Sequence, residues 1–249
     1  MKPPRTSLKN RNGFAVVLIM ALLPCVLAGF LLCFSTVGFI QTDLALKYQC
    51  RSLGESTQDK VRPLLTALLA LNPLAVQLRI ELAQAMAEIA AAIATENPVA
   101  LAKAKDHYNR VVQKRQELDY KQKQLINNSN RLLRQGHQFT RLQLGRLGAT
   151  SSNVLIKMQL TSVRGEAPRL AVRPDVPDTA PIYNPLPDFE TQQALAHEWQ
   201  YRLQVQAPFS AFLKGSFTFK KACAVTLTEE NALWRTKIIK GKFSLKSVW

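Results

Sequence analysis

The longest hydrophobic pattern in the chain is an apolar run from Phe14 to Ile40 that contains no Asp, Glu, Lys or Arg. A helix needs about 20 such residues to cross the roughly 30 Å hydrocarbon core of a membrane. The apolar part of a secretory signal is only about 7–15 residues long and ends at a small-x-small cleavage site. Because this run continues well beyond that length, it predicts a retained transmembrane helix over residues 14–40 rather than a removed signal peptide.

The charges on the two sides of this run differ. The leader of residues 1–13 carries no acidic side chain, and its basic residues are Lys2, Arg5, Lys9 and Arg11. The segment after residue 40 is mixed in sign. Positive charge next to a membrane helix marks its cytoplasmic side. We therefore expect a single-pass protein of the inner (cytoplasmic) membrane, with a cytoplasmic N-terminus and with residues 41–249 on the extracytoplasmic (periplasmic) side.

Residues 41–148 show apolar side chains at helical spacing, so we expect an extracytoplasmic helical region there. Pro63, Asn72-Pro73 and Asn97-Pro98 interrupt it, and each predicts a helix start or a kink. The Ala- and Leu-rich stretch between the second and third of these breaks has one broad apolar face, which includes Leu78, Ile80, Leu82, Met86, Ile89 and Ile93. Such a face is either core or a partner-binding surface, and core is the simpler interpretation.

The next helix, expected from about Val99 to Gln135, has a narrower apolar stripe. Its apolar residues recur every seventh position, at Val111, Leu118, Leu125 and Leu132. Lys and Gln occupy the positions that a full heptad seam would make apolar, which argues against an independent coiled coil. We expect this stripe to lie along another helix, as one arm of a helical hairpin.

From about residue 149 to residue 249 the pattern changes to the alternation and β-branched or aromatic enrichment of strands. The strand-like segments are "NVLIKMQLTSV", "EWQYRLQVQA", "GSFTFKKACAVTLT" and "LWRTKIIKGKFSL". Between the first two lies a Pro-rich loop, residues 173–188, which we expect to be irregular because proline lacks a backbone donor. The predicted fold class is α+β: a membrane helix, a helical hairpin and a small, mainly antiparallel β domain.

The chain has 249 residues and a formal net charge of +16. Such a charge raises nucleic acid as a partner. Two observations argue against it: the charge is spread along the helices and strands without a recognisable nucleic-acid-binding motif, and the inferred compartment is extracytoplasmic. We expect no nucleic-acid partner. Anionic lipid, a cell-wall polymer or an acidic partner subunit remain open as partners for a basic exterior.

Cysteines lie both inside and outside the apolar run. Cys25 and Cys33 belong to the run and are expected to pack as small apolar residues. Cys50 and Cys223 lie outside it. In an oxidising compartment these two predict a single long-range disulfide, and the alternative is two unrelated buried thiols.

Catalytic motifs are not found in this sequence. It contains no G-x-S-x-G, no phosphate-binding glycine loop, no H-E-x-x-H and no C-x-x-C. His107 and His137 stand in polar helical surroundings that predict solvated side chains, and His197 falls on an expected strand without a nominated catalytic partner. We therefore expect no enzyme activity, no catalytic residue, no cofactor and no metal site.

The N-terminus does carry a recognisable pattern. A basic leader, then Gly13 and Phe14, then a long apolar helix with Leu23-Pro24 about ten residues into it, resembles type IV pilins and pseudopilins. More narrowly, residues 9 to about 55 are similar to the TadE/TadG-like minor components of the tight-adherence (Tad) pilus. The resemblance implies that a prepilin peptidase cuts after Gly13 and leaves Phe14 as the new N-terminus. It also implies that the helix stays in the bilayer until subunits are drawn into a filament or its initiating complex.

One position departs from the pilin pattern. Pilins carry a glutamate at the fifth mature residue, where it neutralises a neighbour's amino terminus in the apolar filament core, and this chain has Leu18 there. The leucine argues against a major, polymerising subunit and agrees with a tip or priming subunit, or with an unprocessed TadG-type anchor. The sequence leaves two other readings open: a single-pass scaffold of another secretion or envelope complex, and an ectodomain that binds a ligand or acts as an enzyme.

Overall fold

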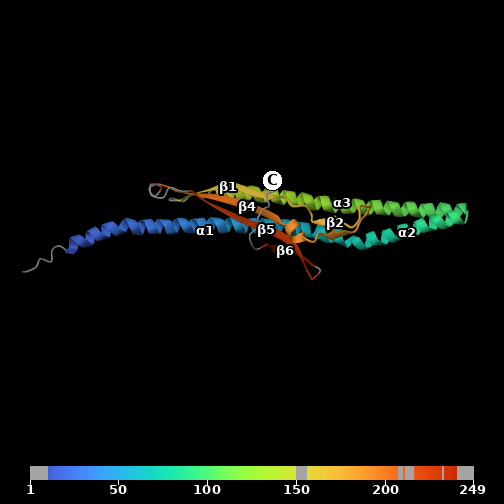
Figure 1. Ribbon diagram of the computed structural model, residues 1–249, viewed down its shortest axis with the longest axis horizontal. Coiled ribbons are helices and arrows are strands. Elements are labelled where there is room, and N and C mark those ends of the chain that lie inside the picture. The colour runs from blue at the N-terminus through green and yellow to red at the C-terminus, as the bar shows by residue number, and fades with distance from the viewer. Residues whose placement is uncertain (1–10, 150–155, 207–209, 211–215, 232, 240–249) are drawn as a thin grey trace, which may run out of the picture.

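The computed structural model describes residues 11–149, 156–206, 210, 216–231 and 233–239. Three helices, α1 (Arg11–Ala70), α2 (Asn72–Ala94) and α3 (Pro98–Ala149), form a long hairpin with a four-stranded sheet beside it (Figure 1). The apolar half of α1 extends beyond the hairpin at one end, and the α2–α3 turn forms the other end (Figure 1). The expected α+β architecture is confirmed.

Helix α1 is a single element of 60 residues, which at 1.5 Å per residue is about 90 Å long. Pro24 and Pro63 lie inside it without ending it, so no helix starts at Pro63, one of the two outcomes predicted there. The other two predicted starts are correct. Helix α2 begins at Asn72, and the Asn97 side chain caps α3 by accepting hydrogen bonds from the backbone N–H groups of Val99 and Ala100, both at 3.1 Å.

The predicted hairpin is present, since α3 packs along both α1 and α2. Leu118 of the heptad stripe is buried with Leu78 of α2. Leu132 of the stripe and its neighbour Leu133 pack in the cluster that contains Leu65 of α1. Helix α3 continues past the predicted end near Gln135 because its last turns, including Leu144, pack against the sheet. Burial of one stripe therefore stabilises a helix whose other faces are polar.

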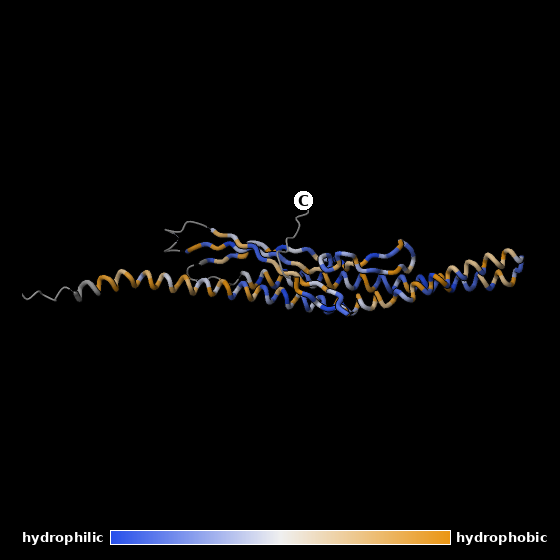
Figure 2. Tube along the Cα trace, turned by 60° about the horizontal axis from the view of Figure 1, so that its bottom comes forward, coloured by the Kyte–Doolittle hydropathy of each residue, from blue (hydrophilic) through white to orange (hydrophobic). Residues whose placement is uncertain are grey.

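The main sheet contains β1 (Ile156–Glu166), β4 (Leu195–Val205), β5 (Ser216–Glu230) and β6 (Leu233–Ile238), in the order β1-β4-β5-β6. All neighbouring strands are antiparallel. Residues of β4 and β5 pack against the helices and form the core, among them Trp199, Tyr201 and Leu227, all fully buried. The sheet thus covers one side of the hairpin, as Figure 2 also shows.

The Pro-rich segment is more ordered than expected. It contains two short paired strands, β2 (Val172–Pro174) and β3 (Tyr183–Pro185), and is followed by the short helix α4 (Phe189–Gln192). The prediction of an irregular loop over residues 173–188 is wrong at these strands because their prolines stand at strand ends, where a missing donor is tolerated. Helix α2 supports β3 directly: the Asn72 side chain donates to the Tyr183 carbonyl at 2.8 Å and accepts from its N–H at 3.0 Å.

A buried glutamine of α1 joins this helix to strand β5 and to the residue that follows α4. Gln58 is fully buried, and its Nε2 donates to the carbonyl of Gln193 at 2.9 Å and to that of Val225 at 3.2 Å. Gln193 in turn accepts a hydrogen bond from the Ala171 N–H at 3.0 Å. Since a buried polar group costs free energy unless it is paired, this network favours one arrangement of helix, sheet and Pro-rich segment.

The predicted disulfide is confirmed. Cys50 of α1 is bonded to Cys223 of β5, with a Cα–Cα separation of 6.5 Å across a sequence separation of 173 residues. The bond links the helix that carries the apolar run to a central strand of the sheet. It is therefore a covalent connection between α1 and the β layer.

Our first prediction concerns this disulfide. Replacing Cys50 and Cys223 together by alanine releases a long loop, and the chain-entropy model gives up to about 5 kcal/mol of lost stability. Chemical denaturation of the full chain in detergent measures the change, and non-reducing peptide mapping identifies the bonded pair. The control is the Cys25→Ser/Cys33→Ser variant, since both of these cysteines are free. Equal unfolding midpoints for the two double variants would contradict the prediction.

Our second prediction concerns the close approach of α1 and β5. A Cβ atom added at Gly54 would lie 2.8 Å from a methyl carbon of Val225, whereas one added at Gly145 of α3 meets nothing within 4 Å. We expect Gly54→Ala to destabilise the fold by about 1–3 kcal/mol through overpacking. Gly145→Ala should instead stabilise it by up to about 1 kcal/mol through helix propensity. Thermal or chemical denaturation measures both, and a shift of the same sign in the two variants would rule this interpretation out.

Candidate functional site

The apolar half of α1 has no protein neighbours over most of its length. From Val16 to Phe34 nearly every side chain is exposed, and burial on one face begins only at Ser35. Figure 2 shows this half of α1 as a mainly hydrophobic segment that extends beyond the rest of the fold. Within the described residues this is the one helix that is long and apolar enough to cross a membrane. Exposed apolar side chains around the whole circumference are typical of a helix whose solvent is lipid.

Gly13 and Phe14, the predicted processing site, lie in the first turn of α1, which begins at Arg11. The exposed apolar segment follows them directly. Leu18, at the position that is glutamate in pilins, is exposed on this segment. The predicted leader up to residue 10 lies outside the described residues.

Polar and aromatic groups meet where the apolar run ends. Asp43 is buried and pairs with Lys47 one turn later on α1, at 2.6 Å between Oδ2 and Nζ. Burial, together with the negative charge of Asp43, raises the pKa of Tyr201 on β4. The Phe39 ring packs edge-on against the Tyr201 ring, with centroids 5.8 Å apart. The sheet is therefore held against α1 at the end of the apolar run.

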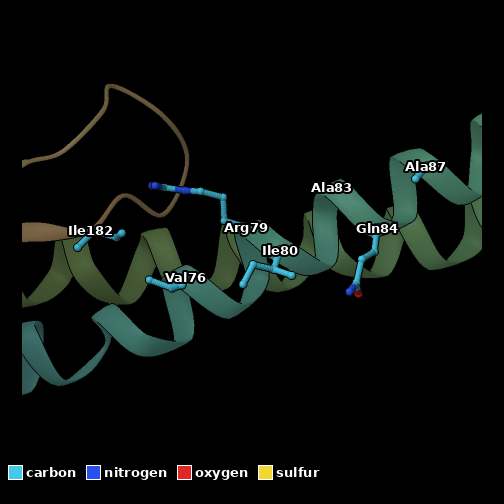
Figure 3. A pocket seen from close by; sticks show the side chains of 7 residues that line it. All are labelled: Val76, Arg79, Ile80, Ala83, Gln84, Ala87 and Ile182. Atoms are coloured by element: carbon cyan, nitrogen blue, oxygen red, sulfur yellow. The ribbon is translucent and has the colours of Figure 1, made fainter.

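A shallow apolar groove of about 410 Å³ lies on α2 (Figure 3). Helix α2 lies toward the end of the molecule away from the apolar half of α1 (Figure 1). Its lining residues are Val76, Arg79, Ile80, Ala83, Gln84, Ala87 and Ile182. Ile80 and Met86, both on the predicted apolar face of α2, are more than half exposed, whereas Leu78 is buried. The simpler interpretation of that face as core is thus wrong for part of it, because α3 covers only one side of α2.

Two arginines fix the Pro-rich segment beside this groove. Arg79 of α2 makes two hydrogen bonds to Asp175, at 2.8 and 3.3 Å, and this lowers the pKa of Asp175 to about 2. Arg115 of α3 donates to Asp178 at 2.7 Å and lowers the pKa of that carboxyl. In Figure 3 Arg79 extends toward the Pro-rich loop and Ile80 points away from it. These ion pairs hold one wall of the groove in place.

His137 and His197 form a buried stacked pair, with ring centroids 4.8 Å apart. The expectation of a solvated His137 is therefore wrong, because β4 covers the end of α3. His197 Nε2 lies 3.3 Å from the His137 carbonyl, which only accepts, so Nε2 carries the hydrogen and Nδ1 is left without a partner among the described residues. Burial first, then the neighbouring His137 and Arg141, lowers the pKa of His197 to about 4.

Metal-binding chemistry is not found in the described parts of the chain, where no three His, Cys, Asp or Glu side chains gather suitably. His107 is bonded to Glu88 at 2.9 Å across the α2–α3 pair. Cys25 and Cys33 are free and exposed on the apolar segment. Among the described residues, the apolar half of α1 and the α2 groove are therefore candidate contact surfaces.

The sequence indicated only part of this site. The apolar half of α1 and the Cys50–Cys223 pair could be recognised from composition and compartment. The histidine pair could not, because no periodicity relates position 137 to position 197, which lie on a helix and on a strand. The alternation along β4 was the one available signal, since it places His197 on the same face as Trp199 and Tyr201.

Comparison with known proteins gave no relatives. No protein-family model matches the chain, and no curated protein or solved structure matches it either.

Our third prediction concerns the histidine pair. The pKa of His197 is about 4 in the fold and near the ordinary 6.5 when unfolded. The unfolded chain therefore binds a proton first as the pH falls. The contribution of His197 to the free energy of unfolding is therefore fully present above about pH 6.5. It decreases toward pH 4, by up to about 3 kcal/mol.

Denaturation of the full chain between pH 7.5 and pH 4 measures this effect. His197→Phe keeps a ring for stacking and should flatten the profile, although it loses the bond to the His137 carbonyl. The control is Phe139→Leu on α3, the helix of His137. It changes an exposed side chain that carries no titrating group and should keep the profile. An unchanged pH slope in His197→Phe would contradict the assignment.

Proposed function

We propose that this protein is a membrane-anchored minor pilin or pseudopilin-like subunit that helps to assemble or anchor a Tad or type IV pilus-like filament or secretion apparatus. Its anchor is the apolar half of α1, with the N-terminus in the cytoplasm and the remainder on the extracytoplasmic side of the inner membrane. Its partners are the lipid bilayer and other pilin-like or secretion-apparatus subunits, which it meets through the membrane helix. It performs no catalysis.

The observation that carries this proposal is the continuity of α1. One helix without a break extends from the exposed apolar segment into the core of the ectodomain. Displacement of the membrane segment along its axis would therefore move the whole ectodomain as one body. A subunit that passes from a bilayer into an assembling filament needs this mechanical coupling, whereas a flexible tether would serve an anchor alone.

Leu18 restricts the role within such an assembly. The segment from Val16 to Phe34 offers lipid or partner helices only apolar contact, with no carboxylate to neutralise a neighbouring amino terminus. An uncharged helix of this kind suits a subunit that occupies one end of a filament or its initiating complex. We therefore favour a priming or tip role over repeated polymerisation.

A second candidate function rests on the α2 groove. In a single-pass scaffold of another envelope complex, the far end of the hairpin would hold a partner protein, and the exposed Ile80 beside Val76 supplies an apolar contact surface. This reading needs no processing at Gly13. The N-terminus of the mature protein therefore distinguishes the two.

Our fourth prediction tests processing at Gly13. A prepilin peptidase works at the cytoplasmic membrane face, and Gly13 precedes the apolar run directly. In membranes that contain the cognate peptidase, the mature chain should begin at Phe14. Gly13→Ala should reduce this trimming and Gly13→Val should abolish it, because glycine lacks the Cβ that hinders close approach to a protease. Intact-mass measurement resolves the loss of the leader.

The control is Gly29→Val, which changes a glycine inside the apolar segment and should leave trimming unchanged. A mature protein that still starts at or near Met1 would exclude the processed pilin. In that case, crosslinks from the membrane helix to pilus-machinery subunits would support an unprocessed TadG-like anchor. Crosslinks from the α2 groove alone would favour the scaffold.

A further inference from the structure

The apolar run is longer than a bilayer requires. From Phe14 to Phe34, α1 rises by about 30 Å, which already equals the thickness of a typical hydrocarbon core. The run continues to Ile40, which adds about another 9 Å. If α1 crosses a membrane as proposed above, the turns from Ser35 to Ile40 lie at the level of the lipid headgroups.

The folded ectodomain already covers one side of α1 at these same turns. Ser35 is 2% exposed, although it stands within the apolar run. Phe39, one turn further, contacts the Phe219 ring of β5 at 6.1 Å between centroids. The opposite side of the helix stays open, since Val37 and Ile40 are exposed. The end of the sheet and the end of the apolar run therefore lie at the same position along the axis of α1.

Strand β5 runs in the same direction as α1, so its first residues lie closest to the membrane. Phe219 lies beside Phe39, Cys223 is bonded to Cys50, and Val225 contacts Gly54. Two residues before Phe219, and about 7 Å closer to the membrane, stands Phe217. Phe217 is 60% exposed and Phe219 is 43% exposed. Two large aromatic rings are thus left uncovered at the level where aromatic residues gather in membrane proteins.

The other face of the same sheet end is cationic. Strand pairing sets Arg202 opposite Thr218 and Lys157 opposite Gln204, and Lys220 follows Thr218 on that face. All three cationic side chains are exposed. Toward this end of the sheet the described strands contain no acidic residue. This holds for β1 up to Arg164, for β4 from Trp199 onward and for β5 up to Thr228. Exposed cations at headgroup level are attracted to anionic lipid.

We propose that this sheet end is a second membrane contact of the protein, separate from the transmembrane segment. Phe217 and Phe219 lie in the interfacial layer of the bilayer that α1 crosses, and Lys157, Arg202 and Lys220 meet anionic phospholipid headgroups. The continuity with α1, the uncovered rings and the single sign of charge together identify lipid as the occupant. This contact sets the tilt and rotation of the ectodomain on the membrane, which one helix alone does not set.

Spin-label depth measurements on the full chain in nanodiscs test the proposal. In a Cys25→Ser/Cys33→Ser background, which keeps the Cys50–Cys223 bond, single labels are placed through Phe217→Cys, Leu233→Cys and Val26→Cys. Leu233 is a matched control because it is also 60% exposed, on the same sheet, and it lies beside Arg62 to Ala70 of α1, far from Phe39. Both labelled positions are outside the core, so neither variant disturbs folding.

The readout is the accessibility of each label to oxygen relative to a water-soluble nickel chelate. We expect this ratio to be several-fold higher at position 217 than at position 233 in discs that contain anionic lipid. The Arg202→Glu/Lys220→Glu change should reduce the difference, as should discs of zwitterionic lipid alone. Equal ratios at positions 217 and 233 would overturn the proposal and would assign the exposed rings to a protein partner.

The label at Val26 separates this proposal from the anchor on which it rests. A lipid-like ratio at position 26 with a water-like ratio at position 217 would overturn the sheet contact alone. Water-like ratios at both positions would overturn the transmembrane anchor and the sheet contact together.

Discussion

The structure depends on one continuous helix, α1, whose two halves have different surroundings. The first half of α1 is apolar around its circumference and uncovered, and from Ser35 to Leu68 a single face is buried at helical spacing under α3 and the sheet. Because the helix does not break between these halves, the position of the exposed apolar half determines the position of the buried half in the core. The disulfide at Cys50 and the buried amide of Gln58 then attach the sheet to that same helix.

The described buried polar groups and exposed surfaces have different roles. The buried polar groups that are described serve packing: Gln58 joins three elements, Arg115 holds Asp178, and His197 remains neutral because its surroundings penalise charge. The surfaces left over are the apolar half of α1, the end of the sheet next to it, and the groove on α2. Each is suited to binding a lipid layer or another chain, which agrees with a role in an assembly.

Local patterns in the sequence were sufficient for most of the architecture. The helix breaks at Asn72 and Asn97, the heptad stripe of α3 and the alternation of the four main strands were all recognisable, because each depends on neighbours within a few residues. The predictions about prolines that failed share one physical cause. Pro63 did not break α1, and the prolines of β2 and β3 did not prevent pairing, because tertiary contacts such as those of Asn72 and Gln58 stabilise the backbone there.

The sequence by itself determined that the chain has one membrane-length apolar helix, a helical hairpin, an antiparallel sheet and two cysteines suited to pairing. These follow from the period of the hydrophobic pattern and from composition. Only the tertiary structure decided which side of α2 stays open, that His137 is buried on His197, and that Phe219 packs beside Phe39 in the last apolar turns of α1. The last of these depends on the register of β5 along α1. The Cys50–Cys223 and Gly54–Val225 contacts set this register, and no local pattern encodes it because they join distant residues.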